Sequence, residues 1–100
     1  MAQAEAALIA RPTIFAEDAL AWALLGAGRS SEALPHATAA VRLGTEHALL
    51  WYHLAVIETE TGRLADARAH LARAFAIDPH LSVRDLPAAQ ALATRLGVTW

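Results

Sequence analysis

Hydrophobic residues recur along this chain at the spacing of amphipathic α-helices, and no stretch alternates as a β-strand would. The apolar positions of the first helical stretch are Phe15, Ala19, Trp22 and Ala23. Thr13 stands at the N-cap position before them, and Gly26 and Gly28 predict where this helix ends.

The same reading predicts four more helices. Ser30 or Ser31 is expected to cap the second helix, which runs to about Leu43 before Gly44 stops it. Further helices are predicted over 46–61, which Gly62 closes, and over 64–77, which Asp78-Pro79 ends. A last helix is predicted over 85–97, with an apolar stripe at Ala89, Leu92, Ala93 and Leu96. The fold class is therefore all-α.

The helices belong to a repeated unit of 34 residues. The positions that agree after a shift of 34 are Leu20/Leu54, Ala21/Ala55, Gly28/Gly62, Arg29/Arg63, Ala33/Ala67, His36/His70 and Ala40/Ala74. We therefore divide a single domain, 1–100, into two helical hairpins, 14–47 and 48–81, followed by a C-terminal capping helix, 85–97. Residues 1–11 are expected to form part of a helix from a preceding unit, so the chain is interpreted as a segment of a longer solenoid.

The second unit resembles the tetratricopeptide repeat family. It carries that family's pattern at Trp51, Leu54, Ala55, Gly62, Ala67, Leu71, Ala74 and Pro79. The first unit keeps the small and glycine positions but has Glu17 in the tryptophan slot and Thr45 in the proline slot. The resemblance covers residues 14–81 and implies a right-handed α-α superhelix of stacked antiparallel hairpins, a TPR-like solenoid.

Composition excludes several classes of function. With 56% hydrophobic and 18% charged residues among 100, the chain is too apolar to be disordered. It contains no cysteine and no lysine, so thiolate sites, disulfides and Schiff-base chemistry are excluded. A net charge of −2 argues against nucleic acid or a membrane surface as partner. No apolar run reaches about 18 residues, and no signal-peptide pattern is present, so a cytoplasmic location is favoured.

The resemblance implies a concave groove, lined by the first helix of each unit, that binds extended peptides or partner helices. Carried over by position, the groove candidates are Phe15, Asp18, Trp22, Leu25, Leu49, Tyr52, Val56, Thr59 and Glu60. Tryptophan and tyrosine are enriched at binding hot spots, but packing of Trp22 and Tyr52 against neighbouring helices is an equally weighted alternative. Such a groove suits an apolar segment that carries a basic residue.

One version of the family is excluded. Its best-known pocket clamps a C-terminal carboxylate with lysines, arginines and asparagines, whereas the matching positions here hold Asp18, Trp22 and His53. An aspartate at that point would repel a carboxylate. The chain is therefore not expected to bind partners by a carboxylate clamp.

Glu58 occupies a position where the family prefers a large, packed residue. Either it is a functional carboxylate in the groove wall, or it forms an ion pair with an arginine from the C-terminal helix, Arg84 or Arg95. Buried charges are seldom unpaired, so the ion pair is the favoured interpretation.

No enzyme and no cofactor are predicted. The five histidines form no HExxH motif and no pair three or four residues apart, which argues against a metal site. His36 and His70 share one slot of successive repeats, a recurrence that structure explains better than metal ligation. The serines lie at expected caps or links, and no phosphate loop or nucleophile elbow is present.

Two functions remain for the chain. The favoured one is a non-catalytic scaffold whose groove binds another protein or a peptide. The alternative is a structural segment that self-associates through apolar faces at its ends, at Ala6, Leu8 and Ile9 and around Leu92 and Leu96.

Overall fold

The first described helix begins at the predicted cap. The computed structural model describes residues 13–100, and in it the Thr13 hydroxyl oxygen accepts a hydrogen bond from the Ala16 N–H at 3.1 Å. The described helices are α2 (Ile14–Gly26), α3 (Ser30–Val41), α4 (Ala48–Glu60), α5 (Leu64–Ile77) and α6 (Leu86–Leu96). The helix expected within residues 1–11, with Ala6, Leu8 and Ile9, lies outside the described residues.

Both hairpins turn in the same way. Gly28 and Gly62 take positive φ angles of 77° and 80°, which residues with a side chain rarely adopt. The next amide then reaches back over the helix end, so that Arg29 N–H donates to the Leu24 carbonyl and Arg63 N–H to the Glu58 carbonyl, each at 2.8 Å.

The predicted serine cap of the second helix is wrong. The N-cap residue of α3 is Arg29, whose side chain makes no capping hydrogen bond, and Ser30 is already helical. The cause is the turn at Gly28, which leaves Arg29 as the last residue before the first helical residue of α3, Ser30.

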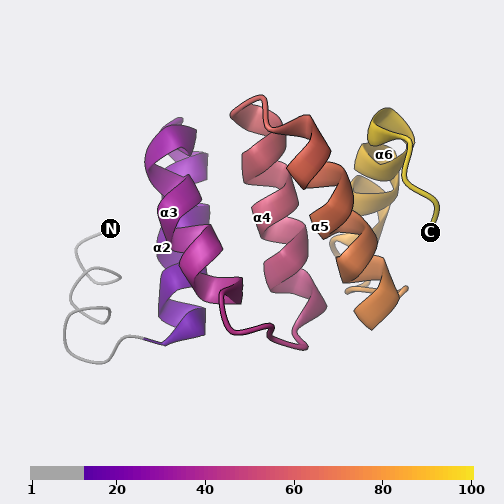
Figure 1. Cartoon of the computed structure of the whole chain (residues 1–100), viewed down its shortest axis with the longest axis horizontal. Helices are drawn as coiled ribbons and strands as arrows, with labels where there is room; N and C mark the ends of the chain where they lie inside the picture. Colours follow the sequence, from indigo (N-terminus) through magenta and orange to yellow (C-terminus); the bar gives the residue numbers. More distant parts are fainter. Residues whose placement is uncertain (1–12) are drawn as a thin grey trace.

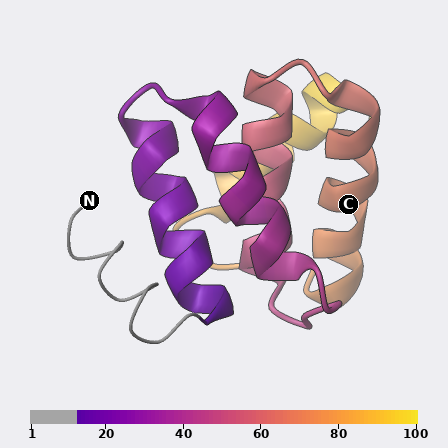
Figure 2. The same ribbon diagram turned by 60° about the vertical axis from the view of Figure 1, so that its left-hand side comes forward.

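The helices stand side by side in a row (Figure 1). The α2–α3 hairpin is followed by the α4–α5 hairpin and then by α6, and the view turned by 60° shows the same succession (Figure 2). α3 packs against α4, and α5 against α6, so each hairpin covers the next. Residues 13–100 contain no strand. The predicted all-α stack of helical hairpins is confirmed.

Small residues allow the helices to approach closely. The alanines of the repeat pattern are all at most 1% exposed: Ala21, Ala33, Ala40, Ala55, Ala67 and Ala74. Leu54, Ile57 and Leu71 fill the space between them and are the largest fully buried side chains. α4 is covered on most of its surface, because it packs against α5 on one side and α3 on the other.

The C-terminal helix does not present the expected apolar face to solvent. Leu96 is only 7% exposed and Leu92 is half-buried, because their stripe packs toward the core. The strongly exposed apolar side chains near this end are Val83 and Trp100 instead.

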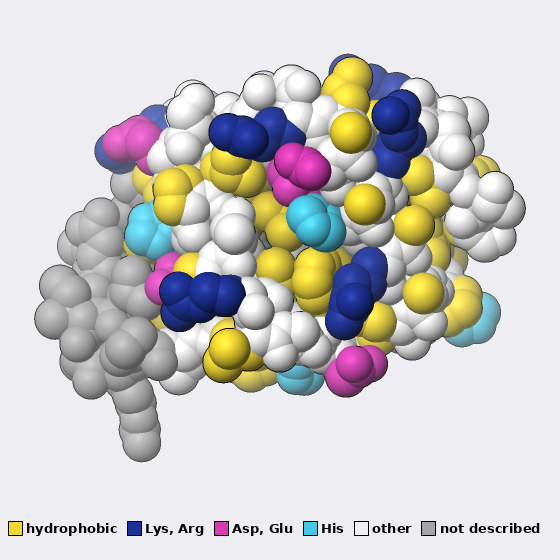
Figure 3. All heavy atoms as spheres, viewed as in Figure 1, with side chains coloured by type: hydrophobic (Ala, Val, Ile, Leu, Met, Phe, Trp, Pro, Cys, Tyr) yellow, Lys and Arg dark blue, Asp and Glu magenta, His cyan; other side chains and the backbone are white. Residues whose placement is uncertain are grey.

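The face formed by α3 and α5 carries many charged side chains. Arginine side chains are spread over it, with carboxylates among them (Figure 3). None of the helices described in residues 13–100 is both long and apolar enough to cross a membrane.

Candidate functional site

The groove candidates on α2 form one stripe that faces α4. Phe15, Asp18, Trp22 and Leu25 recur at intervals of three and four residues, which places them on one face of a helix. The Phe15 ring meets the His47 ring edge-on, with 4.9 Å between centroids. The Trp22 ring stacks on the His53 ring of α4, with 3.8 Å between centroids. The structure therefore brings this face of α2 against the start and middle of α4.

Exposure separates the candidates into surface and core. Phe15 is 54% exposed, Trp22 is 37% exposed and Glu60 is exposed. The half-buried candidates are Asp18, Leu25, Leu49, Val56 and Thr59. Tyr52 is only 5% exposed, so core packing, the alternative left open by the sequence, describes this residue. Burial raises the pKa of the Tyr52 hydroxyl, and the nearby negative charge of Asp85 adds to the rise.

Asp18, His53 and Trp22 form a compact cluster between α2 and α4. His53 Nδ1 lies 2.8 Å from Asp18 Oδ1, and the two side chains are 9% and 15% exposed. A carboxylate oxygen can only accept, so His53 carries a proton on Nδ1 and donates it to Asp18. The three positions at which the family's carboxylate clamp would place cations and amides thus hold an aspartate–histidine pair covered by an indole ring.

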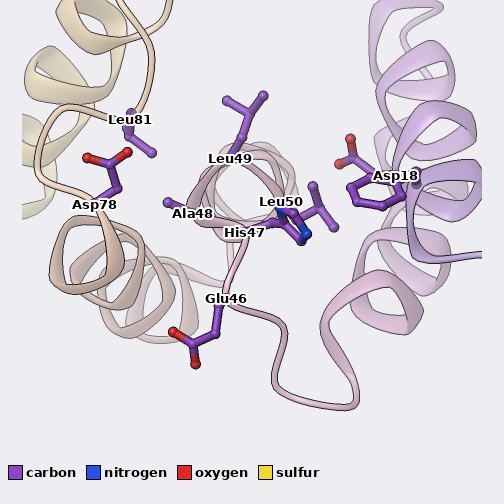
Figure 4. Close-up of a pocket in the computed structure, with 9 residues that line it drawn as sticks. Asp18, Glu46, His47, Ala48, Leu49, Leu50, Asp78 and Leu81 are labelled. Carbon is purple, nitrogen blue, oxygen red and sulfur yellow. The ribbon is translucent and has the colours of Figure 1, made fainter.

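A hollow of about 370 Å³ opens at the end of the groove where α4 begins. Its lining residues are Phe15, Asp18, Glu46, His47, Ala48, Leu49, Leu50, Asp78 and Leu81. Leu49 projects between Asp18 on one side and Leu81 and Asp78 on the other, whereas Glu46 points away (Figure 4). The lining thus combines carboxylates with apolar side chains and contains no arginine.

Glu58 pairs with a histidine, and its predicted partners are wrong. Glu58 is 4% exposed, and its Oε1 accepts from His70 Nδ1 at 2.7 Å. Arg84 and Arg95 are both exposed. The reason is that Glu58 faces α5, its own hairpin partner, rather than the C-terminal helix. Burial raises the pKa of the Glu58 carboxyl, and the hydrogen bond from His70 opposes this rise without cancelling it.

The recurring histidine slot has a structural role in both hairpins. His36 Nδ1 lies 2.9 Å from Glu17 Oε2, and Glu17 occupies the slot that Trp51 fills in the second unit. His70 correspondingly lies against Trp51, with 5.4 Å between ring centroids. His36 and His70 therefore each contact the first helix of their own hairpin. Within residues 13–100, no three metal-ligating side chains gather in one place.

Sequence reasoning missed seven residues of this site: Glu46, His47, Ala48, Leu50, His53, Asp78 and Leu81. His53 was assigned only as a clamp position, and its hydrogen bond spans 35 residues of sequence, which no local pattern reveals. Asp78 and Leu81 belong to the link between α5 and α6, which passes the start of α4. Only the helix stop at Asp78-Pro79 pointed to these two residues, because the chain must turn back after it to begin the next helix.

These features define a class of protein: a stack of helical hairpins whose first helices share a half-open face, with exposed aromatic side chains on α2. The family model described as tetratricopeptide repeat matches residues 19–82, well over half of the chain. The chain belongs to the tetratricopeptide repeat family. No curated protein and no solved structure matches it. Members of this family generally act as scaffolds for protein–protein interaction and are typically non-catalytic.

Proposed function

We propose that this chain is a non-catalytic scaffold that binds a segment of another protein across the face shared by α2 and α4. The observation that carries the proposal is the exposure of Phe15 (54%) and Trp22 (37%) on one stripe of α2. Exposed aromatic rings beside half-buried apolar side chains offer contact area that a partner can bury. Leu49 and Val56 supply such apolar surface on α4.

A binding role suits the titratable groups better than catalysis does. The histidine–carboxylate pairs join neighbouring helices, as His36–Glu17 joins α3 to α2 and His70–Glu58 joins α5 to α4. Among residues 13–100, only the Asp18–His53 pair lies on the groove face, and an indole ring covers its imidazole. Ser30 and Ser31 lie at the start of α3, away from this pair. A nucleophile–base–orienter arrangement would need all three groups within hydrogen-bonding reach.

The test is co-purification from host lysate followed by titration of the captured partner. Trp22→Ala should weaken the partner's affinity about 10- to 30-fold, as expected for a hot-spot aromatic. Phe15→Ala should weaken it by a smaller factor, because Phe15 is more exposed. Tyr52 is unsuitable as a variant, since its burial makes Tyr52→Ala a core substitution.

The matched control is Trp100→Ala, which removes another half-exposed tryptophan far along the chain, packed against Phe75. Circular dichroism on every variant guards against loss of the fold. A partner that binds wild type and Trp22→Ala equally well would contradict the proposal.

The alternative function, a self-associating structural segment, rests on the ends of the stack. Leu43 is 89% exposed beside a second hollow of about 260 Å³, which Ile14 and Ala39 also line. Exposed apolar surface of this kind can pack against another copy. Light scattering separates the two functions, because a strict monomer at high concentration excludes the alternative. A dimer that Leu43→Asp converts to a monomer supports it.

A further inference from the structure

The helices that form the groove carry no positive charge from arginine or lysine. α2 and α4 contain four carboxylates and not one basic residue besides histidine. Asp18 and Glu60 are groove candidates, whereas Glu17 and Glu58 pair with histidines of α3 and α5. The arginines of the described residues lie elsewhere, on turns, on the α5 and α6 helices and after α3. The two groove helices thus differ in charge from the arginine-bearing turns and from α5, and Figure 3 shows arginine side chains on the face where α3 and α5 lie.

Carboxylates line the hollow where α4 begins. Asp18 from α2 and Asp78 from the end of α5 stand on opposite sides of Leu49 (Figure 4). Phe15, which is 54% exposed, and Leu81 extend the apolar surface between the carboxylates. Its volume of about 370 Å³ is at the lower end of the range for ligand pockets, about 300–1,000 Å³.

One feature reduces the negative charge of the hollow without reversing it. The N-terminal end of α4 lies in the hollow, and a helix N-terminus is equivalent to roughly half a positive charge. His53 donates a hydrogen bond to Asp18 Oδ1, which leaves the charge of that carboxylate in place while the imidazole is neutral. Asp78 Oδ1 accepts from the His80 backbone N–H at 3.0 Å, a neutral donor. The carboxylates therefore outweigh the helix end.

We propose that this hollow binds an arginine or lysine side chain, next to an apolar residue, from an extended segment of a partner protein. The inference rests on the proposed function and names the chemistry of its partner. The aliphatic stem of the cationic side chain would lie along Leu49 and the Phe15 ring, and its charged head would reach one of the two carboxylates, Asp18 or Asp78. A partner with an acidic residue at this point would be repelled.

The experiment is a selection from a library of random 12-residue peptides displayed on phage. Binders are selected on the wild-type chain, and peptides that also bind Trp22→Ala are removed. Among the remaining peptides we expect arginine or lysine beside a large apolar residue to be enriched over aspartate and glutamate. On the double variant Asp18→Asn/Asp78→Asn this enrichment should disappear. Asparagine preserves an acceptor for His53 Nδ1 and for the His80 N–H, so the variant should keep its fold.

The matched control is Asp66→Asn, which removes one exposed carboxylate from α5 and should leave the enrichment intact. The best peptide is then titrated with its cationic residue intact and replaced by glutamine. We expect the replacement to weaken binding about 5- to 10-fold on wild type and less than twofold on the double variant.

The outcomes separate the two proposals. Peptides that depend on Trp22 but show no cationic preference would overturn the inference and leave the proposed function standing. If no peptide depends on Trp22, both fall. A dimer in light scattering that Asp18→Asn/Asp78→Asn makes monomeric would assign the hollow to a second copy of the chain, and would also overturn the inference.

Discussion

At the scale of single residues, Glu58 shows how burial and hydrogen bonding compete. Its pKa is raised because the loss of hydration outweighs the hydrogen bond from His70 Nδ1. A carboxyl whose pKa is higher in the folded than in the unfolded state binds its proton more tightly when folded. Its contribution to stability is therefore complete below the ordinary value of 4.5 and is lost as pH rises through the raised value.

Glu58→Gln should accordingly remove a pH-dependent cost. The glutamine amide oxygen can still accept from His70 Nδ1, but it carries no charge to desolvate. We expect the free energy of unfolding at pH 7 to be unchanged or higher by up to about 1 kcal/mol, and the gap between variant and wild type to widen as pH rises from 4.5. Urea unfolding followed by circular dichroism between pH 4 and pH 8 measures it.

Two further variants remove the histidine of a pair rather than the carboxylate. His70→Ala leaves the buried Glu58 carboxylate without this donor and should cost about 1–3 kcal/mol of unfolding free energy. His36→Ala should cost less than about 1 kcal/mol, because the Glu17 side chain that it leaves is 21% exposed. If wild type instead gains stability over Glu58→Gln as pH rises, the charged pair is net stabilising and the argument from burial is wrong.

The structural role of a residue was predictable from the sequence only where a repeat position or a local pattern decides that role. The small residues at Ala55 and Ala67 and the Thr13 cap follow from such patterns, and the structure confirms them. The partner of Glu58 did not follow, because charge complementarity alone favoured an arginine. A clue was present, since His36 and His70 share a slot and Glu17 shares one with Trp51, which implies a recurring contact across each hairpin.

At the scale of the helices, we expect two glycines to respond oppositely to substitution, because only one of them has a positive φ angle. Gly62 has a φ of +80° and lets Arg63 N–H reach the Glu58 carbonyl. Gly26 is the last residue of α2, has no positive φ, and has open space where a Cβ would lie. The backbone conformation, rather than the space available, therefore distinguishes the two positions.

Gly62→Ala should lower the free energy of unfolding by about 1 kcal/mol or more, because alanine is strained in the left-handed region. Gly26→Ala should raise it by about 0.4–1 kcal/mol, because alanine loses less chain entropy on folding. Thermal and urea unfolding of both variants, with the helix content checked by circular dichroism, measure the difference. If both substitutions change the free energy of unfolding equally and in the same direction, the backbone conformations assigned to Gly26 and Gly62 are wrong.

Helix positions were predictable because hydrophobic periodicity and glycine stops act over a few residues. The helix predicted over 64–77 has those bounds, whereas the predicted helices 46–61 and 85–97 are each slightly longer than α4 and α6. The residue at which a helix ends depends on which terminal backbone amides find a hydrogen-bond partner. The conformation of the adjoining turn decides this. The exposure of a helix face depends on the neighbouring helix, which is why Leu96 was placed on the surface and is buried.

At the scale of the whole molecule, stability is distributed along a row rather than around one centre. Each helix is covered mainly by its immediate neighbours, and α4 in the middle contributes nine of the buried residues, whereas α6 at the end contributes three. In such a stack an end unit can open without the rest. The proposed binding face is formed by α2 and α4, so it combines the most covered helix with one that buries fewer residues.

Hydrogen exchange should resolve this gradient. We expect the slowest amides in α4, around Leu54 and Ile57, and faster exchange in α6. Leu96→Ala removes a buried side chain from α6, and a loss of about 2 kcal/mol or more corresponds to exchange about 30-fold faster there. Amides of α2 should keep their rates, because α6 can open alone.

The control for this prediction is Leu64→Ala, since Leu64 is 46% exposed at the start of α5 and its loss should alter no helix appreciably. Exchange followed by mass spectrometry of proteolytic fragments, or by NMR, reads each helix separately. If Leu96→Ala accelerates α2 and α4 as much as α6, the stack opens as a single cooperative unit. In that case a partner that spans α2 and α4 would stabilise the whole chain on binding. If α6 opens independently, the partner would stabilise only the helices that it contacts.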